Sequence, residues 1–135
     1  MFDSQQARDF ILIDDPKIKQ QPRPLAQNQS VLTEAPLVIA VCTNLEQIKP
    51  YGKRGTELYC LQDAAVAIDH LLLLATAEGL ATCWVGAFDE KHVQTLLQLP
   101  DHIRPVALIP IGYANEQPIK TKRIDLKEIL HYNTW

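Results

Sequence analysis

The sequence has few of the residues that the common phosphate-binding and hydrolytic motifs need. Its five glycines form neither a GxGxxG nor a GxxxxGK pattern, which excludes the usual dinucleotide-binding loop and the P-loop. The only serines are Ser4 and Ser30, and neither lies in a GxSxG elbow, so a serine hydrolase is not expected. The formal net charge of −3 leaves no basic excess to neutralise phosphates, which argues against a general nucleic-acid binder.

Cysteine and histidine are too scattered to predict a metal centre or a disulfide framework. Cys42, Cys60 and Cys83 are widely spaced with no CxxC pair, as expected for buried apolar residues in a reducing compartment. The four histidines form no HxH or HxxxH pair, so no metal site is predicted. Cys83, beside Trp84, is a candidate nucleophile, but a buried strand cysteine is the simpler interpretation because no histidine is predicted to approach it. We assign no catalytic residue.

Targeting and membrane segments are not predicted either. The N-terminus lacks a basic segment followed by an apolar run, as a signal peptide would have. The longest apolar stretch is interrupted by Asp69 and His70, and we expect it to be shorter than the roughly 20 residues of a membrane span. We therefore expect one cytoplasmic domain over residues 1–135. Its parts are a strand and irregular arm (1–30), a core (31–115) and a tail (116–135).

Residues 57–88 are the stretch around which the rest of the chain is organised. Leu and Ala dominate a predicted helix from Glu57 to Glu78, which should end at Gly79. A helix that is apolar on nearly every side must be buried nearly all round, in a core or against another subunit. A short apolar run, Leu80–Val85, and a turn at Gly86 follow. This arrangement places backbone amides beside the core, where a flat ligand could bind.

Three other apolar runs predict strands. Phe10–Ile13 suits a buried strand that ends in a turn, and Leu37–Cys42 suits a central strand. Pro105–Ile111 is a third strand, in which Pro110 fits best at an edge or strand end because it has no N–H. Strands and helices are mixed with too few βαβ repeats for a doubly wound fold, which predicts the α+β class.

The segments between these runs are predicted mainly from proline and capping residues. Pro22 and Pro24 exclude one continuous helix over residues 17–30, so we expect a loop with one helical turn on either side. Residues 43–56 are polar and contain Pro50 and two glycines, which predicts a long loop. Asp89 is a candidate N-cap of a short amphipathic helix.

Five stretches, in this order along the chain, resemble the nitroreductase family of FMN-dependent oxidoreductases. FDSQQARDFILIDDP is similar to the family's F-N-x-Q-x-x-R-x-x-x-L segment, and LTEAPLVIAVC to its A-P-x-x-I-x-V strand. DAAVAIDHLLLLATAE followed by GLATCWVGAF resembles its central helix and flavin-edge loop. LLQLPDHIRPVALIPIGY and KTKRIDLKEILHYNTW resemble its last strand and its closing segment. The resemblance covers nearly the whole chain.

The resemblance implies a fold, a cofactor and an assembly. The fold is a central, mainly antiparallel sheet flanked by helices, with a long buried central helix. The family is typically a homodimer with FMN at the subunit interface and a C-terminal tail that reaches the partner subunit. The flavin accepts a hydride from NAD(P)H and passes electrons to a small-molecule acceptor, a nitro compound or a quinone.

The resemblance also implies which residues touch the cofactor. Backbone contacts to the isoalloxazine are implied for five consecutive residues, Cys83, Trp84, Val85, Gly86 and Ala87. Arg123, helped by Lys120 or Lys122, is implied to hold the phosphate. Asp3 and Gln5 lie in the segment that borders the flavin, and Asp3 stands where the family usually has Asn. Without the resemblance, residues 120–123 could equally be a solvated charge run, and Trp84 and Phe88 could be core aromatics.

The sequence departs from the family at one motif. Family members carry an N-terminal R-R-S-x-R segment that holds the FMN phosphate, and no such segment occurs in this sequence. Two alternatives to an active flavoenzyme follow. The chain could be a shortened homologue with weak or no FMN binding that acts as a non-catalytic binding or assembly subunit. It could also be a fragment of a longer enzyme.

Overall fold

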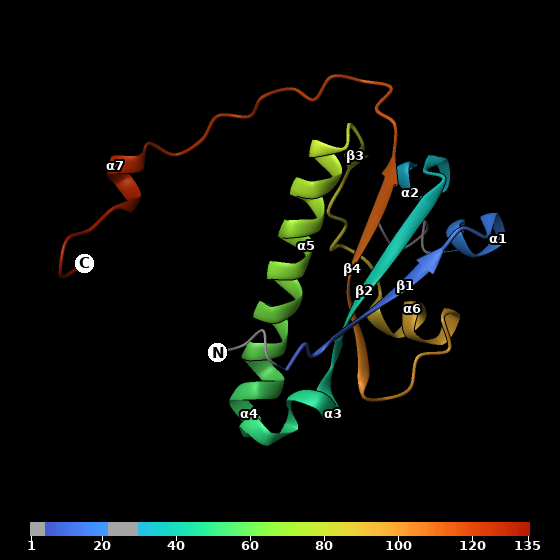
Figure 1. Ribbon diagram of the computed structural model, residues 1–135, viewed down its shortest axis with the longest axis horizontal. Helices are drawn as coiled ribbons and strands as arrows, with labels where there is room; N and C mark the ends of the chain where they lie inside the picture. Colours follow the sequence, from blue (N-terminus) through green and yellow to red (C-terminus); the bar gives the residue numbers. More distant parts are fainter. Residues whose placement is uncertain (1–4, 22–29) are drawn as a thin grey trace.

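A four-stranded antiparallel sheet lies at the centre of the computed structural model, which describes residues 5–21 and 30–135 (Figure 1). The strands are β1 (Arg8–Ile13), β2 (Leu37–Asn44), β3 (Ala81–Thr82) and β4 (Ile103–Gly112), and their order in the sheet is β1-β2-β4-β3. Helices pack on both faces of this sheet. The predicted α+β class and mainly antiparallel sheet are confirmed.

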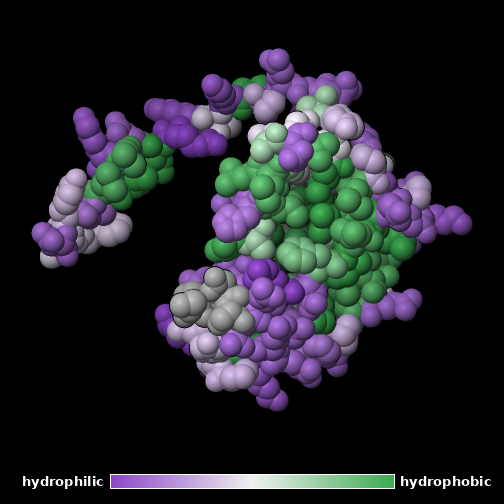
Figure 2. Space-filling model, in the orientation of Figure 1, coloured by the Kyte–Doolittle hydropathy of each residue, from purple (hydrophilic) through white to green (hydrophobic). Residues whose placement is uncertain are grey.

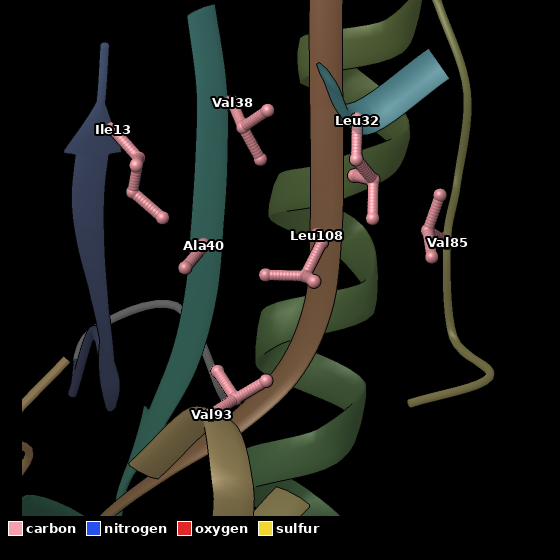
Figure 3. Packing of buried hydrophobic residues seen from close by; sticks show 7 residues of the cluster. All are labelled: Ile13, Leu32, Val38, Ala40, Val85, Val93 and Leu108. Carbon is pink, nitrogen blue, oxygen red and sulfur yellow. The ribbon is translucent and has the colours of Figure 1, made fainter. Parts of the chain in front are cut away.

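The two outer faces of the sheet bury different side chains. On one face, α2 (Val31–Glu34) and α6 (Glu90–Leu96) cover an apolar cluster, whose members Figure 3 shows converging from both sheet and helices. That cluster consists of Ile13, Leu32, Val38, Ala40, Val85, Val93 and Leu108. On the other face, Ala64 and Ile68 of the long helix α5 (Cys60–Ala77) pack on Ile39, Val41 and Ile109. The two central strands, β2 and β4, therefore contribute alternate residues to two separate cores.

The strand predictions are confirmed in position but not all in burial. Leu37–Cys42 is central as predicted, because β2 pairs with both β1 and β4. Phe10–Ile13, predicted to be buried, lies in the edge strand β1, where Phe10 is 46 % exposed and Leu12 is 66 % exposed. Ile13 points into the core, whereas Phe10 and Leu12 alternate with it and point to the other face of the sheet, where they stay largely exposed.

Helix α5 ends as predicted and begins close to the predicted residue. Its last residue is Ala77, and Gly79 follows with a φ of +74°, a left-handed conformation that glycine adopts without strain. A π-helical turn, η2 (Gly55–Tyr59), leads directly into α5, so helical backbone already covers the predicted start at Glu57.

The long loop predicted over residues 43–56 is wrong. This segment continues β2 and then forms α3 (Leu45–Ile48), η1 (Lys49–Tyr51), α4 (Gly52–Arg54) and the start of η2. Asn44 starts the helical stretch, because its side chain accepts a hydrogen bond of 3.1 Å from the backbone N–H of Gln47. Gly55 permits the turn, since a Cβ there would lie only 2.8 Å from the carbonyl oxygen of Ile48.

Within this chain α5 is buried on one side only, so the expected burial nearly all round would require another subunit against its other side. Ala64, Ile68 and Ala75 are buried against the sheet. Val66, Leu73 and Leu74 are 55 %, 63 % and 67 % exposed. Figure 2 shows a broad hydrophobic surface on the face of the molecule that carries α5. Apolar surface of this extent usually marks a contact with another molecule.

The expectation that no stretch is long enough for a membrane span is also wrong. The continuous helical stretch Leu45–Ala77 has 33 residues and is apolar enough, by length and composition, to cross a membrane. Asp69 and His70 do not interrupt it, because both lie inside the helix. Length and composition are weak evidence by themselves, since the core helix of a water-soluble protein passes the same test.

The remaining helices are short. Residues 22–29, which include Pro22 and Pro24, lie outside the described part of the chain. One helical turn flanks them on either side, α1 (Pro16–Lys19) before and α2 after. The predicted N-cap of α6 is confirmed, because the Asp89 side chain accepts a 2.9 Å hydrogen bond from the backbone N–H of His92. After Gly112 the chain forms an exposed arm that leads away from the sheet to α7 (Leu126–Ile129) (Figure 1).

Candidate functional site

The loop after β3 is anchored to the middle of the sheet at one residue. The backbone N–H of Val85 donates to the carbonyl of Leu108 at 3.0 Å, and the N–H of Leu108 donates to the carbonyl of Val85 at 2.9 Å. The Val85 side chain is buried in the core cluster. Cys83 and Trp84 before it, and Gly86 and Ala87 after it, are all exposed. The predicted flavin-edge loop is therefore a short exposed segment with one fixed point.

Pro110 explains why Cys83 and Trp84 leave the sheet. β4 pairs with β3 at Ile111, opposite Thr82, and next pairs with the loop at Leu108, opposite Val85. The Leu108 N–H points towards this side, and N–H directions alternate along a strand, so the nitrogen of Pro110 points there too. Because proline has no N–H, β4 cannot donate a ladder bond to the loop at that position. The prediction that Pro110 lies at an edge or strand end is wrong, since it is buried in a strand paired on both sides.

Gly86 and Ala87 have the backbone groups that a flat, hydrogen-bond-accepting ligand needs. Neither residue uses its backbone N–H in a hydrogen bond to another described residue, and both face solvent. A Cβ built on Gly86 would touch nothing closer than the Trp84 indole nitrogen at 3.7 Å, so the space at this position is open. Free amides on an anchored loop fit the edge of an isoalloxazine, which carries carbonyl and ring-nitrogen acceptors.

The side chains around the loop differ from the simplest sequence interpretation. Cys83 is exposed and not a buried strand cysteine, and no group of three metal-binding side chains occurs among the described residues. Trp84 is 45 % exposed, whereas Phe88 packs on the core. The other two cysteines are buried as predicted. Burial, with a smaller contribution from Asp9, raises the pKa of Cys42 to about 12, and burial also raises the pKa of Cys60. Neither buried thiol is therefore suited to act as a nucleophile.

A cleft of about 720 Å³ adjoins the start of the loop. Thr82 and Cys83 line one side of it, and the first residues of the arm, Tyr113–Glu116, line another. Pro36 completes the lining, and its carbonyl and that of Ala35 accept hydrogen bonds of 3.1 and 2.7 Å from the buried ammonium of Lys19. The lining contains Glu34 and Glu116 but no basic residue among the described part of the chain, so it does not suit a phosphate.

The three residues predicted to hold the phosphate are not brought to the loop within one chain. Lys120, Lys122 and Arg123 are exposed on the arm, which Figure 1 shows running away from the sheet. Among the residues that the structure describes, the Arg123 guanidinium hydrogen-bonds only to Thr121, through its side chain and, at 3.4 Å, its carbonyl. These cations have no acidic partner among the described residues and are available to an anion.

Gln5 lies on the opposite edge of the sheet from the loop. It precedes β1, the edge strand on one side, whereas the loop follows β3, the edge strand on the other side. Gln5 is half-buried, and Gln6 follows with a φ of +46°. Asp3 lies outside the described residues. One chain therefore holds the predicted contacts in three separate places: the loop, the arm and the turn at Gln5.

An ion pair close to Gln5 was not predicted from the sequence. Arg8 Nη1 lies 2.5 Å from Asp63 Oδ1, and the Asp63 side chain is only 4 % exposed. The two residues are 55 positions apart, so no local pattern joins them. A signal for Asp63 does exist: it falls on the helix face of Cys60, Ala64 and Ile68, the side that packs on the sheet.

Comparison with known proteins decides the family. The model of the nitroreductase family matches residues 4–113, which is most of the chain. The chain belongs to the nitroreductase family. Among curated proteins it is 25 % identical over 144 residues to an FMN reductase (NADPH) of Bacillus subtilis, covering 96 % of this chain and 58 % of that protein. It is 23 % identical over 149 residues to an NADH dehydrogenase of Thermus thermophilus, covering 90 % of this chain and 73 % of that protein.

Solved structures agree on the fold. The nitroreductase NfrA1 from B. subtilis superposes with a TM-score of 0.86 at 24 % identity, covering 96 % of this chain and 58 % of that one. A nitroreductase family protein from Clostridium novyi NT superposes with a TM-score of 0.70 at 33 % identity, covering 80 % of this chain and 62 % of that one. The chain spans little more than half the length of the first curated relatives it matches.

Proposed function

We propose that this protein is an FMN-dependent NAD(P)H oxidoreductase of the nitroreductase type, which passes electrons to nitro compounds or quinones. The observation that carries the proposal is the pair of free, exposed amides at Gly86 and Ala87, held beside the anchored Val85. Relatives named FMN reductase (NADPH) and NADH dehydrogenase support a general oxidoreductase function. The flavin and the particular acceptors are our extension of that support.

The protein's part in this chemistry is to hold and orient the flavin. The hydrogen bonds between Val85 and Leu108 fix the loop before any ligand arrives, so its amides need no reorganisation to donate. The amides of Gly86 and Ala87 would donate to the isoalloxazine edge. Arg123 would hold the phosphate with its planar fork, and Lys120 or Lys122 would add charge. The chemistry that bound FMN would supply is hydride acceptance from NAD(P)H and electron transfer to the acceptor. No acid–base side chain is required, in line with the absence of a predicted catalytic residue.

We propose further that the active form is a cytoplasmic homodimer. A second copy would cover the exposed side of α5, where Val66, Leu73 and Leu74 face solvent. The arm offers matching apolar residues, since Leu126 and Ile129 of α7 are 61 % and 56 % exposed. A C-terminal tail that reaches the partner subunit would bury both surfaces. It would also bring the proposed phosphate-binding cations, Lys120, Lys122 and Arg123, close to a flavin site whose parts lie far apart in one chain.

The alternative, a non-catalytic binding or assembly subunit without FMN, gains no support from the relatives named above. An assay separates the two functions. We expect the protein, supplied with FMN, to oxidise NADH or NADPH in the presence of a quinone or a nitroaromatic compound. The Gly86→Ala variant, whose Cβ occupies the open space beside the amides, should need a higher FMN concentration for the same activity. No turnover with either donor and any of these acceptors, in protein shown to retain FMN, would remove the proposed reaction.

A further inference from the structure

Arg8 and Asp63 form an ion pair that is largely withdrawn from water. Arg8 lies in the first position of β1 and Asp63 in the first turn of α5, and their side chains are 21 % and 4 % exposed. Removing charges from water costs free energy that the pairing rarely returns in full, so a buried ion pair is weak evidence for stability alone. Such a pair calls for an explanation in terms of position or function.

The surroundings of Asp63 are incompletely satisfied. Its second carboxylate oxygen, Oδ2, is buried and has no hydrogen-bond partner among residues 5–21 and 30–135. The hydroxyl of Thr43, the cross-strand neighbour of Arg8, is also buried without a partner in that part of the chain. The Cys60 thiol lies close to Thr43. Unsatisfied buried polar groups are uncommon in folded proteins, and each one has a cost. The fold therefore keeps the Asp63 carboxyl group buried in spite of that cost.

The backbone before Arg8 is fixed at several points. Gln6 has a φ of +46°, and its carbonyl accepts a 2.7 Å hydrogen bond from the Arg8 N–H. Ala7 is fully buried beside Ile48 and Cys60. The Ala7 carbonyl accepts a 2.9 Å hydrogen bond from the N–H of Asn44. The turn at Gln5 and Gln6 therefore has one defined path into β1.

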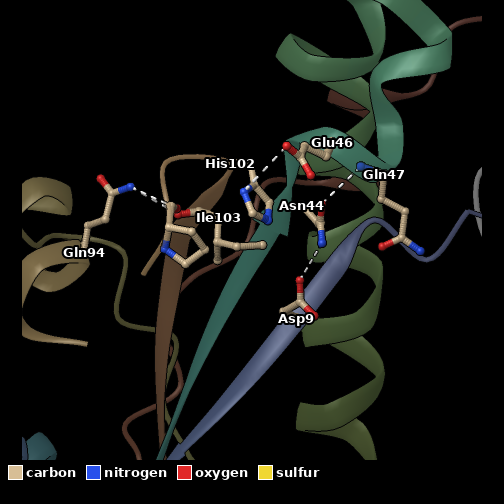
Figure 4. Close-up of polar contacts among 8 residues, drawn as sticks. Asp9, Asn44, Glu46, Gln47, Gln94, His102 and Ile103 are labelled. Atoms are coloured by element: carbon tan, nitrogen blue, oxygen red, sulfur yellow. Dashed lines mark hydrogen bonds and ion pairs between the residues drawn. The ribbon is translucent and has the colours of Figure 1, made fainter. Parts of the chain in front are cut away.

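Asp9, the next residue of β1, is held by Asn44 of the neighbouring strand β2. The Asn44 side chain donates to Asp9 at 2.9 Å, and its amide oxygen caps α3 at Gln47 (Figure 4). These bonds lie on exposed groups and fix β1 only against β2. Among the described residues, the Arg8–Asp63 pair is the one side-chain bond that ties the start of β1 to α5.

We infer that Asp63 and Arg8 are positioning residues for the flavin site: through their ion pair they set the position of the Gln5 turn. The inference rests on the proposed function, because only there does Gln5 border the flavin. Asp63 acts on the ligand through Arg8 and the backbone of Gln5–Ala7, and does not touch it. The apolar packing of Ala7 alone would hold this turn loosely, and the ion pair fixes its orientation.

The test uses the full chain and the variant Asp63→Asn, which keeps the side-chain shape and removes the charge. Two readouts are needed: amide hydrogen exchange of Gln5–Arg8 without flavin, and the FMN dissociation constant. We expect exchange at Gln5–Arg8 to rise roughly tenfold while β2 and β4 keep their protection. We expect the FMN dissociation constant to rise by roughly tenfold or more, as is usual when a supporting contact of a binding group is lost.

The matched control is Glu90→Gln, which removes the carboxylate of a second ion pair on the opposite face of the sheet. Arg104 binds Glu90 with two hydrogen bonds of 2.8 Å, and Glu90 lies on α6, far from the Gln5 turn along the chain. This variant should lower stability without changing either readout. Arg8→Lys, which keeps the charge but not the fork, serves if Asp63→Asn does not fold, and should also weaken FMN binding.

The outcomes separate the inference from the proposed function. An FMN dissociation constant for Asp63→Asn within about twofold of wild type, or an equal rise in Glu90→Gln, would overturn the positioning role. If wild-type protein binds no FMN, the proposed function fails and the role toward the flavin fails with it. In that case the exchange data still decide whether the pair fixes the turn: unchanged exchange in Asp63→Asn would refute that as well.

Discussion

Val85 and Leu108 exchange two backbone hydrogen bonds, of 3.0 and 2.9 Å, at the centre of the sheet. This pairing fixes the loop that the family resemblance assigns to the flavin edge. The chain on either side of Val85 makes no ladder contact, so exposed amides lie next to a rigid point. The exposed amides therefore depend on two features: the pairing of Val85 with Leu108, and an obstacle that prevents the neighbouring residues of the loop from pairing with β4.

Pro110 is that obstacle, and replacing it by valine restores a backbone N–H facing Cys83 and Trp84. The new donor lies opposite Cys83 in the register that pairs Thr82 with Ile111 and Val85 with Leu108, and a hydrogen bond there is worth about 0.5–1.5 kcal/mol. We therefore expect Pro110→Val to let the loop close onto β4: urea unfolding should show equal or higher stability, and flavin binding should weaken, with Pro100→Ala, at an exposed position, as the control. A loss of stability with unchanged flavin binding would show that Pro110 is not what keeps the loop open.

The same substitution, glycine to alanine, should lower stability at Gly55 and leave it unchanged at Gly86. Gly55→Ala places a Cβ 2.7 Å from the Cβ of Tyr51, an overlap that should cost about 1–3 kcal/mol of unfolding free energy. Gly86→Ala meets nothing closer than 3.7 Å and should leave the melting temperature unchanged while weakening FMN binding. Thermal melts and flavin titrations of both variants distinguish them. A stable Gly55→Ala protein would contradict the close packing of the π-helical turn.

The pairing of Glu90 with Arg104 predicts a pH dependence. Hydrogen bonds from Arg104 are the main cause that lowers the pKa of Glu90 below its ordinary value of 4.5. The pair therefore stabilises the fold above that ordinary value, and this contribution disappears as the pH falls through the lowered pKa. Because both side chains are nearly half-exposed, the contribution should be small, about 1 kcal/mol or less.

Denaturation of wild type and Glu90→Gln between about pH 3 and 7 measures this contribution. The two proteins should differ at neutral pH and converge in acid. A difference that stays constant with pH would show that the carboxylate charge is not its source.

Leu73→Asp tests the proposed dimer. Leu73 is 63 % exposed in the single chain, so the substitution should not disturb the core. In a dimer the same aspartate would be buried without a partner, at a cost of several kcal/mol. We expect a monomer by sedimentation velocity, whereas Thr95→Asp on the exposed side of α6 should remain dimeric. A dimeric Leu73→Asp protein would remove α5 from the interface.

Arg123→Ala tests the proposed phosphate contact on the arm. Losing a charge-assisted hydrogen bond costs about 1.5–3 kcal/mol, which corresponds to a roughly 10- to 100-fold weaker FMN affinity. Lys127→Ala, on the same arm, removes an equal charge at a position with no predicted phosphate contact. A titration with riboflavin, which has no phosphate, should not distinguish Arg123→Ala from wild type. Equal FMN affinity in the two variants and wild type would exclude Arg123.

Local sequence signals predicted much of the fold. The apolar run Leu37–Cys42, the N-cap Asp89 and the stop at Gly79 are each determined by residues within one element, and all three are confirmed. Residues 43–56 misled because Pro50 and two glycines usually mark a loop. Here Pro50 occupies the first turn of η1, where proline is tolerated, and Gly55 is required by a close contact that no pattern reveals.

The site was less predictable than the fold. The loop at Cys83–Ala87 follows from the family resemblance, but its openness depends on Pro110, a residue of another strand. Arg8 and Asp63 are 55 residues apart, and pairing over that distance depends on the packing of β1 against α5. The apolar composition of α5 shows that it must be covered, yet it does not say which molecule covers it.

A visible absorption spectrum tests the central claim most directly. The protein is purified without added flavin, measured, incubated with FMN, desalted and measured again. Our account predicts a retained flavin band that corresponds to about one FMN per chain, weakened in Gly86→Ala and Arg123→Ala. Wild-type protein that keeps no flavin band after incubation would contradict the proposed flavin site and leave a nitroreductase fold without its cofactor.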